Sequence, residues 1–297
     1  MTGQTVEYSE PIDLLKLYFE KEFPITDKII VYKPSVGDIV EYPDGESGFS
    51  FILHVFTGNT TYFKVFLWDN GIDWNKLTDF EMFCDFITGL DLTVEKTKIL
   101  FGELDFSNFK KFVKQKEVTE IVDEEEVVKT VDEIVLYDPI NDIVIDELTY
   151  FRIRFYLRHM FNFFPEIETG IKGKRMKKEI IEYDRKKATK NTKDSGGSFY
   201  LPLISFCLNH PGFKYKKDEL KEIGIVEFLD SVSRLVLNEH CRATLNGIRS
   251  GFVDGSKIKP DEYDFTKDIY ANRKSETVFE KVNQYNQSLG ETGVTNK

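Results

Sequence analysis

The last third of the chain contains two pairs of cysteine and histidine residues that resemble parts of a metal site. Cys207 and His210 lie three residues apart, and His240 and Cys241 are adjacent. Zinc is held by four such ligands in a tetrahedral arrangement. Adjacent residues on a helix point about 100° apart, so His240 and Cys241 are poorly placed to bind one ion. We therefore predict structural residues at these positions and no metal site.

A glycine-rich stretch, Gly170–Lys174, resembles a phosphate-binding loop at first sight. Its sequence is Gly-Ile-Lys-Gly-Lys, and Arg175 follows it. A P-loop has four residues between its glycines and a Ser or Thr after the Lys, because its amides and its hydroxyl bind phosphate and Mg²⁺. This stretch departs from that pattern in both respects. We predict a solvated loop that binds no nucleotide cofactor.

Motifs for the common catalytic chemistries are absent from the sequence. It has no Gly-x-Ser-x-Gly elbow, no zinc-protease helix, no dinucleotide fingerprint and no paired acid and base motif. The acidic run Asp123–Glu126 lacks the central glycine of a calcium loop, which favours the solvated tip of a hairpin. We expect a protein that is not an enzyme, with no catalytic residue, cofactor or metal.

The overall charge argues against a protein that coats nucleic acid. The 297 residues carry a formal net charge of −11, whereas binding along a phosphate backbone needs a summed positive field. One basic stretch, Lys172–Lys193, runs against this trend. Its only apolar line is Met176, Ile180 and Tyr183, so we predict an exposed helix that binds an acidic protein surface, nucleic acid or nothing. The candidate binding residues on it are Lys177, Lys178, Arg185, Lys186 and Lys187.

Aromatic residues are the second unusual feature of the composition. The chain has 26 Phe and an aromatic fraction of 14%, which supplies large apolar areas for a core and for interfaces. The clearest helical stripe lies in Ile225–Asn246, where Phe228, Val232, Leu235, Val236 and Ala243 recur at helical spacing. We predict that Phe228, Val232 and Leu235 form an apolar surface for a partner.

Three cysteines at unrelated spacings do not suggest a disulfide framework. The sequence also has no basic and apolar leader at its start and no apolar run of about 20 residues. These features indicate a cytoplasmic protein that does not insert into a membrane.

The N-terminal part alternates between helical and strand-like patterns. We predict a first helix over Pro11–Phe23, with Ser9 or Glu10 as its cap. Thr78 and Glu81 form a capping box that predicts a further helix ending at Gly89. The spacing of three residues between Phe106, Phe109 and Phe112 predicts a short helix from about Asp105. Between these helices, four β-rich runs separated by Gly and Pro predict a small antiparallel sheet. These runs are Ile29–Tyr32, Ile39–Tyr42, Phe49–Phe56 and Thr61–Phe66.

The middle of the chain alternates acidic and β-branched residues. A turn at Asp138–Asp142 separates the predicted strands Ile134–Tyr137 and Ile143–Ile145, so we predict an inserted β-hairpin. Asp146 is then placed to cap a well-buried helix that ends near Phe161.

These patterns predict an α+β fold: a small antiparallel sheet with helices in the N-terminal half, an inserted β-hairpin, and a mainly helical C-terminal half. We expect an N-terminal domain over residues 1–112 and the acidic hairpin over 113–147. A helical domain follows over 148–269, and it includes the exposed basic helix 172–193. Residues 270–297 form a polar tail.

Four stretches carry a family resemblance, and together they cover most of the chain. They are KPSVGDIVEY (Lys33–Tyr42), LWDNGIDWNKLTDFEMF (Leu67–Phe83), ILFGELDFSNF (Ile99–Phe109) and LNGIRSGFVDGSKI (Leu245–Ile258). They resemble proteins encoded by tailed phages and prophages of Gram-positive bacteria, among which this one looks like a tail assembly chaperone. The acidic segment Glu117–Glu147 matches this family least. The resemblance implies no catalytic residue.

The resemblance implies a virion-morphogenesis protein that binds a phage structural protein such as the tape-measure protein in the host cytoplasm. A structural virion component of the tail, neck or baseplate, located in the particle, is the alternative. A nucleic-acid-binding phage protein acting through Lys172–Lys193 is the third hypothesis, and the net charge opposes it. Self-association into a homo-oligomer is compatible with each of these hypotheses.

Overall fold

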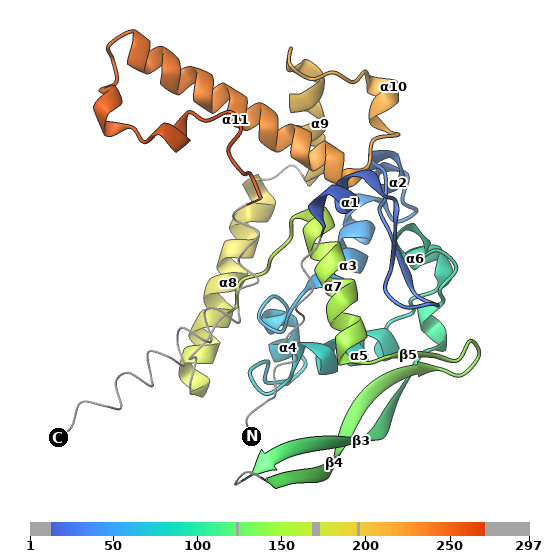
Figure 1. The fold of residues 1–297 in the computed structure, drawn as a ribbon. Coiled ribbons are helices and arrows are strands. Elements are labelled where there is room, and N and C mark those ends of the chain that lie inside the picture. Colours follow the sequence, from blue (N-terminus) through green and yellow to red (C-terminus); the bar gives the residue numbers. More distant parts are fainter. Residues whose placement is uncertain (1–12, 123–124, 168–172, 195–196, 271–297) are drawn as a thin grey trace, which may run out of the picture. The chain divides into compact units, whose positions relative to one another are not determined.

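A computed structural model describes residues 13–122, 125–167, 173–194 and 197–270, and the chain divides into two compact units (Figure 1). Unit 1 consists of Met1–Ser198 and Lys221–Ile225, and unit 2 consists of Phe199–Leu220 and Val226–Lys297. The class is α+β, as predicted. The division predicted from the sequence, into residues 1–112, 113–147, 148–269 and 270–297, is not tested by these two units and stays a prediction.

Unit 1 begins with short elements. They are α1 (Leu14–Phe19), β1 (Glu22–Pro24), β2 (Ile30–Tyr32), α2 (Val36–Val40), α3 (Gly45–Thr57) and α4 (Lys64–Asp69). The Asp13 carboxylate caps α1 by accepting hydrogen bonds from the amides of Leu15 and Lys16. The predicted helix Pro11–Phe23 is therefore too long, because the chain turns to pair β1 with β2. The proposed caps Ser9 and Glu10 lie outside the described residues.

Three of the four predicted N-terminal strands are wrong. Only Ile29–Tyr32 contains a strand, and the runs Ile39–Tyr42, Phe49–Phe56 and Thr61–Phe66 overlap α2, α3 and α4. In α3, five apolar side chains are buried within eight residues, and a short continuous apolar run fits a buried helix as well as a buried strand. The buried side chains are Phe49, Ile52, Leu53, Val55 and Phe56.

Two helices and a single turn follow. α5 (Asp79–Gly89) starts with the predicted capping box, in which the Thr78 amide donates to Glu81 Oε2 at 2.8 Å and the Glu81 amide donates to Thr78 Oγ1 at 3.1 Å. The helix expected from Asp105 is only a 3₁₀ turn, η1 (Phe106–Asn108), which follows α6 (Val94–Phe101). The chain enters a strand at Lys110, so the helical spacing of the Phe residues there is coincidental.

The hairpin is confirmed as a three-stranded antiparallel sheet of strand order β3-β4-β5. β3 (Lys110–Val122) pairs along its whole length with β4 (Glu125–Asp138), from Lys110 opposite Tyr137 to Val122 opposite Glu125. β5 (Ile143–Ile145) pairs only with Leu136–Asp138 at the end of β4. Figure 1 shows β3 and β4 as a long two-stranded ribbon with the short β5 beside one end. We call β3 and β4 the arm.

α7 (Glu147–Phe161) is capped as predicted: Asp146 Oδ1 accepts a hydrogen bond from the Thr149 amide at 2.8 Å. It packs against α3, and its central residue Ile153 is fully buried. The helix ends at Asn162, whose φ of 50° is left-handed, a common way for a helix to stop.

The core of unit 1 is an aromatic cluster. The Phe56 ring lies 5.6 Å from the Phe83 ring, 4.5 Å from the Phe101 ring and 4.9 Å from the Phe106 ring, measured between centroids. Tyr150 of α7 stacks on Phe83 at 4.4 Å. Each such pair adds about 0.5–1.5 kcal/mol beyond its area burial. Much of the excess of Phe is therefore explained by the core.

A returning segment, Lys221–Ile225, belongs to unit 1 because its backbone pairs with the start of α2. The Val36 amide donates to the Ile223 carbonyl at 2.8 Å, and the Ile225 amide donates to the Pro34 carbonyl at 2.9 Å. A Cβ at Gly37 would lie 2.8 Å from the Lys221 carbonyl oxygen, so this approach requires glycine.

Unit 2 is built on the longest helix. Its elements are α9 (Tyr200–Asn209), α10 (Lys217–Leu220), α11 (Ile225–Arg249, whose first residue is in unit 1), η2 (Gly255–Lys257) and η3 (Pro260–Glu262). After α11 the chain runs back along the helix, because the Val253 amide bonds to the Gly247 carbonyl and Arg234 bonds to the Lys267 carbonyl. The predicted turns of Ser275–Gln287 lie outside the described residues.

Candidate protein-binding site

The basic helix α8 (Lys174–Asp194) is attached to the rest of unit 1 by ion pairs with the α4 region. Lys177 Nζ lies 2.6 and 2.7 Å from the two carboxylate oxygens of Asp73. Lys64 of α4 lies 2.6 Å from Asp184, and its side chain is only 8% exposed. Arg185 pairs with Asp69. α8 is thus docked along one side, and most of its described side chains are exposed.

A single apolar side chain supports this docking. Ile181 is 1% exposed, and it lies one helical turn from Lys177 and from Arg185. The predicted apolar line places Met176, Ile180 and Tyr183 on another face. The helix therefore packs by Ile181 and by charge, which the sequence pattern did not reveal because the partner carboxylates lie more than 100 residues away in the chain.

The Lys177 ammonium interacts with two groups at once. Besides its bonds to Asp73, it lies 5.4 Å from the centroid of the buried Trp74 ring, within the range of a cation–π interaction. The hydrogen bond from Lys177 is the largest influence on Asp73 and lowers the pKa of that carboxyl below its usual value.

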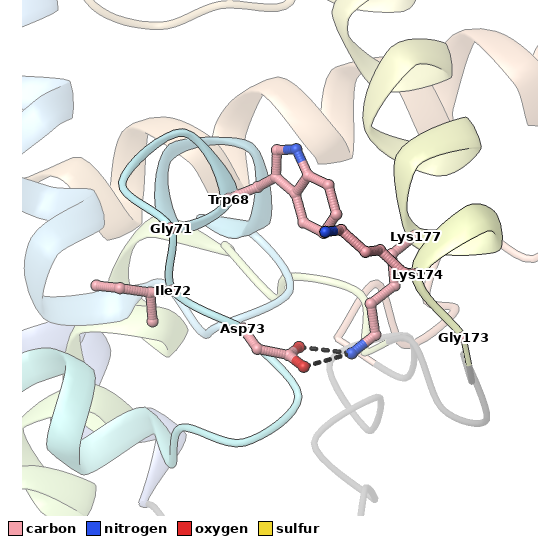
Figure 2. A pocket seen from close by; sticks show the side chains of 7 residues that line it. All are labelled: Trp68, Gly71, Ile72, Asp73, Gly173, Lys174 and Lys177. Atoms are coloured by element: carbon pink, nitrogen blue, oxygen red, sulfur yellow. Dashed lines mark hydrogen bonds and ion pairs between the residues drawn. The ribbon is translucent and has the colours of Figure 1, made fainter.

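A cleft of about 470 Å³ lies between the loop after α4 and the start of α8. Figure 2 shows the Asp73 carboxylate and the Lys177 ammonium closing the space between these two segments. The lining residues are Trp68, Gly71, Ile72, Asp73, Gly173, Lys174 and Lys177. The charges of Asp73 and Lys177 neutralise each other, so Lys174 is the remaining cation of this lining. This set contains no nucleophile with a neighbouring base, and the arrangement suits contact better than catalysis.

The outer side of α8 presents an apolar row to solvent. Met176 is 51% exposed, Tyr183 is 66% exposed, and Ile180 between them is half-buried. Their spacings of four and three residues place all three on one face of the helix. We call Met176, Ile180 and Tyr183 the outer row.

The predicted basic residues divide into two groups. Lys177 and Arg185 are used in ion pairs within unit 1. Lys178 is exposed and lies 3.8 Å from Glu182 of the same helix, while Lys186 and Lys187 are exposed. The exposed group keeps α8 basic toward solvent.

The predicted apolar surface of α11 is largely inaccessible. Phe228 is fully buried, Leu235 is 7% exposed, and Val232 is half-buried. Val236 and Ala243 of the predicted stripe are exposed, so they do not belong to its buried part. The buried line continues instead through Cys241, whose thiol is as apolar as a small hydrophobic side chain.

The cysteine and histidine residues have structural surroundings. The Gly212 amide donates to His210 Nδ1 at 3.0 Å, which leaves Nε2 as the donor to Glu239 at 3.3 Å. Cys207 is buried, and burial raises the pKa of its thiol to about 11. Within residues 13–122, 125–167, 173–194 and 197–270, no group of three or more His, Cys, Asp or Glu side chains is arranged to hold a metal ion.

In the part of the chain that the structure describes, no helix combines the length and the apolar character that crossing a membrane requires.

Comparison with known proteins adds no relative to these observations, because no family model, no curated protein and no solved structure matches the chain.

Proposed function

We propose that this chain is a non-enzymatic phage assembly protein, a tail assembly chaperone that binds a helical segment of the tape-measure protein in the host cytoplasm. The observation that carries the proposal is the outer row of α8. Met176 and Tyr183 are more than half exposed on a helix whose other side is fixed by ion pairs. The resemblance of four sequence stretches to phage morphogenesis proteins supplies the biological setting.

The spacing of the outer row fits a helical partner. Residues at i, i+4 and i+7 form one ridge along a helix, and such ridges pack against the apolar face of a second helix. A long tail component with exposed amphipathic segments offers faces of this kind. Covering them before the tail polymerises is the task of a chaperone.

The docking of α8 favours binding because it fixes the outer row before a partner arrives. Three ion pairs and Ile181 hold the helix in place, so less conformational entropy is lost on association. Fully burying one large apolar side chain contributes about 1.5–3 kcal/mol. Burying the side chains of the outer row therefore contributes only a few such amounts of binding free energy, so stable binding also requires complementary charges.

The charge of α8 specifies the partner further. The helix has nine basic and four acidic residues, a net charge of +5, whereas the whole chain has a net charge of −11. Charge complementarity selects partners and speeds association. We infer that the partner helix is acidic beside its apolar face.

Co-expression with the tape-measure protein of the same phage tests the proposal. We expect the chain to increase the soluble fraction of that protein and to co-purify with it. Met176→Ser with Tyr183→Ser removes the two exposed apolar side chains of the outer row and should abolish both effects. Arg175→Ser with Glu182→Ser is the matched control, since these exposed residues lie off the row and the pair leaves the net charge unchanged. Equal solubilisation by both double variants would overturn the proposal.

A structural virion component is the second candidate, and the arm favours it. Extended ribbons that reach from one subunit to another are well suited to a permanent assembly. Mass spectrometry of purified particles separates the candidates: a chaperone is absent from finished virions, whereas a structural protein is present in stoichiometric amounts.

A further inference from the structure

The arm has an unpaired edge along the full length of β3. The strand order β3-β4-β5 places β3 at the border of the sheet, and no other described strand pairs with its outer side. β4 is also open beyond the three residues that β5 covers. Unpaired strand edges present rows of amide and carbonyl groups that readily bind another strand.

β3 has exposed side chains on both of its faces near the base of the arm, although Val135 and Leu136 opposite it in β4 are buried. Successive residues of a strand point to opposite faces, yet Phe112 is 46% exposed and Val113 is 65% exposed. Lys111, Lys114 and Gln115 are exposed as well. The base of the arm contacts α5, where Lys111 Nζ donates to Asp85 Oδ1 at 2.8 Å. A two-stranded ribbon by itself is only marginally stable in water, so an additional strand would stabilise the arm further.

The sequence of β3 suits pairing with itself in the antiparallel direction. Its first seven residues contain four lysines and no acidic residue, and its last six contain two glutamates and no basic residue. When two β3 edges pair around a two-fold axis, the basic half of each strand lies beside the acidic half of the other. The favourable match therefore occurs twice. Parallel pairing would bring like charges together.

The open edge of β4 is not divided into a basic half and an acidic half. Its residues before the β5 pairing include Glu125, Glu126, Asp132 and Glu133 but only one basic residue, Lys129. Two copies of β4 would therefore place acidic residues beside acidic residues in either direction. The charge pattern therefore favours pairing of two chains through β3 over pairing through β4.

We propose that β3 is a homodimerisation edge, at which the β3 strands of two copies of this chain pair antiparallel near Lys116 and Glu117. The two arms together form a four-stranded sheet of order β4-β3-β3-β4. Each strand of 13 residues spans about 40 Å, so the sheet joins the two copies over a long contact.

Two charge-reversal variants of the full chain test this pairing. The first carries Lys110→Glu and Lys116→Glu, and the second carries Glu117→Lys and Glu120→Lys. The residues directly opposite these four positions in β4 are all uncharged, so neither variant reverses a charge that faces another charge directly across the hairpin. The opposite residues are Tyr137, Val131, Thr130 and Val127. Sedimentation equilibrium measures the association of each variant.

We expect the wild type to dimerise and each variant alone to lose at least about tenfold in affinity, which corresponds to 1.4 kcal/mol. An equimolar mixture of the two variants should dimerise, because every reversed half then meets its complement. A chain carrying all four substitutions should dimerise for the same reason. Circular dichroism and thermal unfolding of each variant verify that it folds.

The control is Asp132→Lys, which changes the β4 edge and faces the uncharged Gln115 across the hairpin; it should leave dimerisation intact. A wild type that stays monomeric at about 100 µM, where a micromolar Kd gives mostly dimer, overturns the proposal. So does a mixture of the two variants that stays monomeric. The test does not involve the tape-measure protein, so its result is independent of the proposed function.

Discussion

α7 and α8 are neighbouring helices in the sequence of unit 1, and both carry several basic residues, yet they are held in different ways. In α7 the basic side chains are built into the core: Arg154 is 13% exposed and bonds to Asp79 at 2.7 Å, and Arg158 donates to the buried Thr57 carbonyl at 2.7 Å. In α8 the ion pairs are mixed: the side chain of Lys177 is 12% exposed, whereas Arg185 and Asp69 are each about half exposed at the rim. Among the described side chains of α8, Ile181 is the buried apolar one.

This difference shows that the contribution of a charge depends on what surrounds it. A charged pair that is removed from water inside an aromatic core leaves an uncompensated charge when one partner is deleted. A pair at a partly solvated rim is screened by water and salt, and its loss has a small effect. We therefore expect α7 to belong to the cooperative core and α8 to detach more easily.

The largest effect should come from the ring that α7 packs on. Phe83→Ala removes a fully buried ring between Phe56 and Tyr150, and we expect unit 1 to lose about 3–5 kcal/mol. Chemical denaturation measures this loss. Leu15→Ala, at a position that is 71% exposed, is the control and should change the free energy of unfolding by less than about 0.5 kcal/mol.

The second largest effect is expected for the ion pair between Asp79 and Arg154 of α7. Asp79→Ala removes the acceptor of Arg154 and of the Thr60 amide, and we expect a loss of about 2–4 kcal/mol. Asp79→Asn should lose less, because the amide oxygen still accepts the bond from Thr60. Equal losses for the two variants would show that the Thr60 bond contributes nothing.

These buried contacts also mark the limit of what the sequence predicts. Local signals succeeded where the responsible residues are neighbours: the capping box at Thr78 and Glu81, the cap at Asp146, and the hairpin were all predicted. The strands assigned to Phe49–Phe56 and Thr61–Phe66 failed, because short apolar runs have no distinct period and only tertiary packing decides their form.

The candidate site was harder to predict than the fold. The basic character of α8 is plain in the sequence, but its docked face depends on Asp69, Asp73 and Lys64, and nothing local connects them with the helix. The apolar stripe predicted for α11 did not reveal which of its residues are buried, because the exposed Val236 fits helical spacing as well as the buried Cys241 does. Spacing alone cannot decide which of two adjacent faces is covered.

A smaller effect is expected at the rim. Asp73→Asn removes the charge of a carboxylate that is 32% exposed but keeps an oxygen that can accept from Lys177, so it should lower stability by about 1 kcal/mol or less. The pKa of Asp73 is lowered by its hydrogen bond from Lys177. The stabilisation is therefore complete above the unfolded pKa near 3.8 and is lost as the pH falls through the lower folded pKa.

Amide hydrogen exchange of α8, compared with that of α7, measures this contribution locally. Protection of α8 should decrease in Asp73→Asn while protection of α7 stays the same. Simultaneous loss of protection in both helices would contradict the view that α8 is held separately at the rim.

The smallest effect on stability is predicted for the outward-facing cations of α8. Reversing Lys178, Lys186 and Lys187 to Glu should change the melting temperature little, because these exposed side chains each contribute only a few tenths of a kcal/mol. Reversing Lys177 in addition should lower the melting temperature measurably, since that ammonium bonds to Asp73.

Binding, however, should respond strongly to the triple variant: an acidic partner helix would lose complementary charge, whereas the outer row would be unchanged. Titration of the tape-measure segment against wild type and variant at two salt concentrations measures this difference. If the wild type instead binds nucleic acid in a salt-dependent way near physiological ionic strength, and the triple variant abolishes that binding, α8 is a nucleic-acid surface and the chaperone proposal fails.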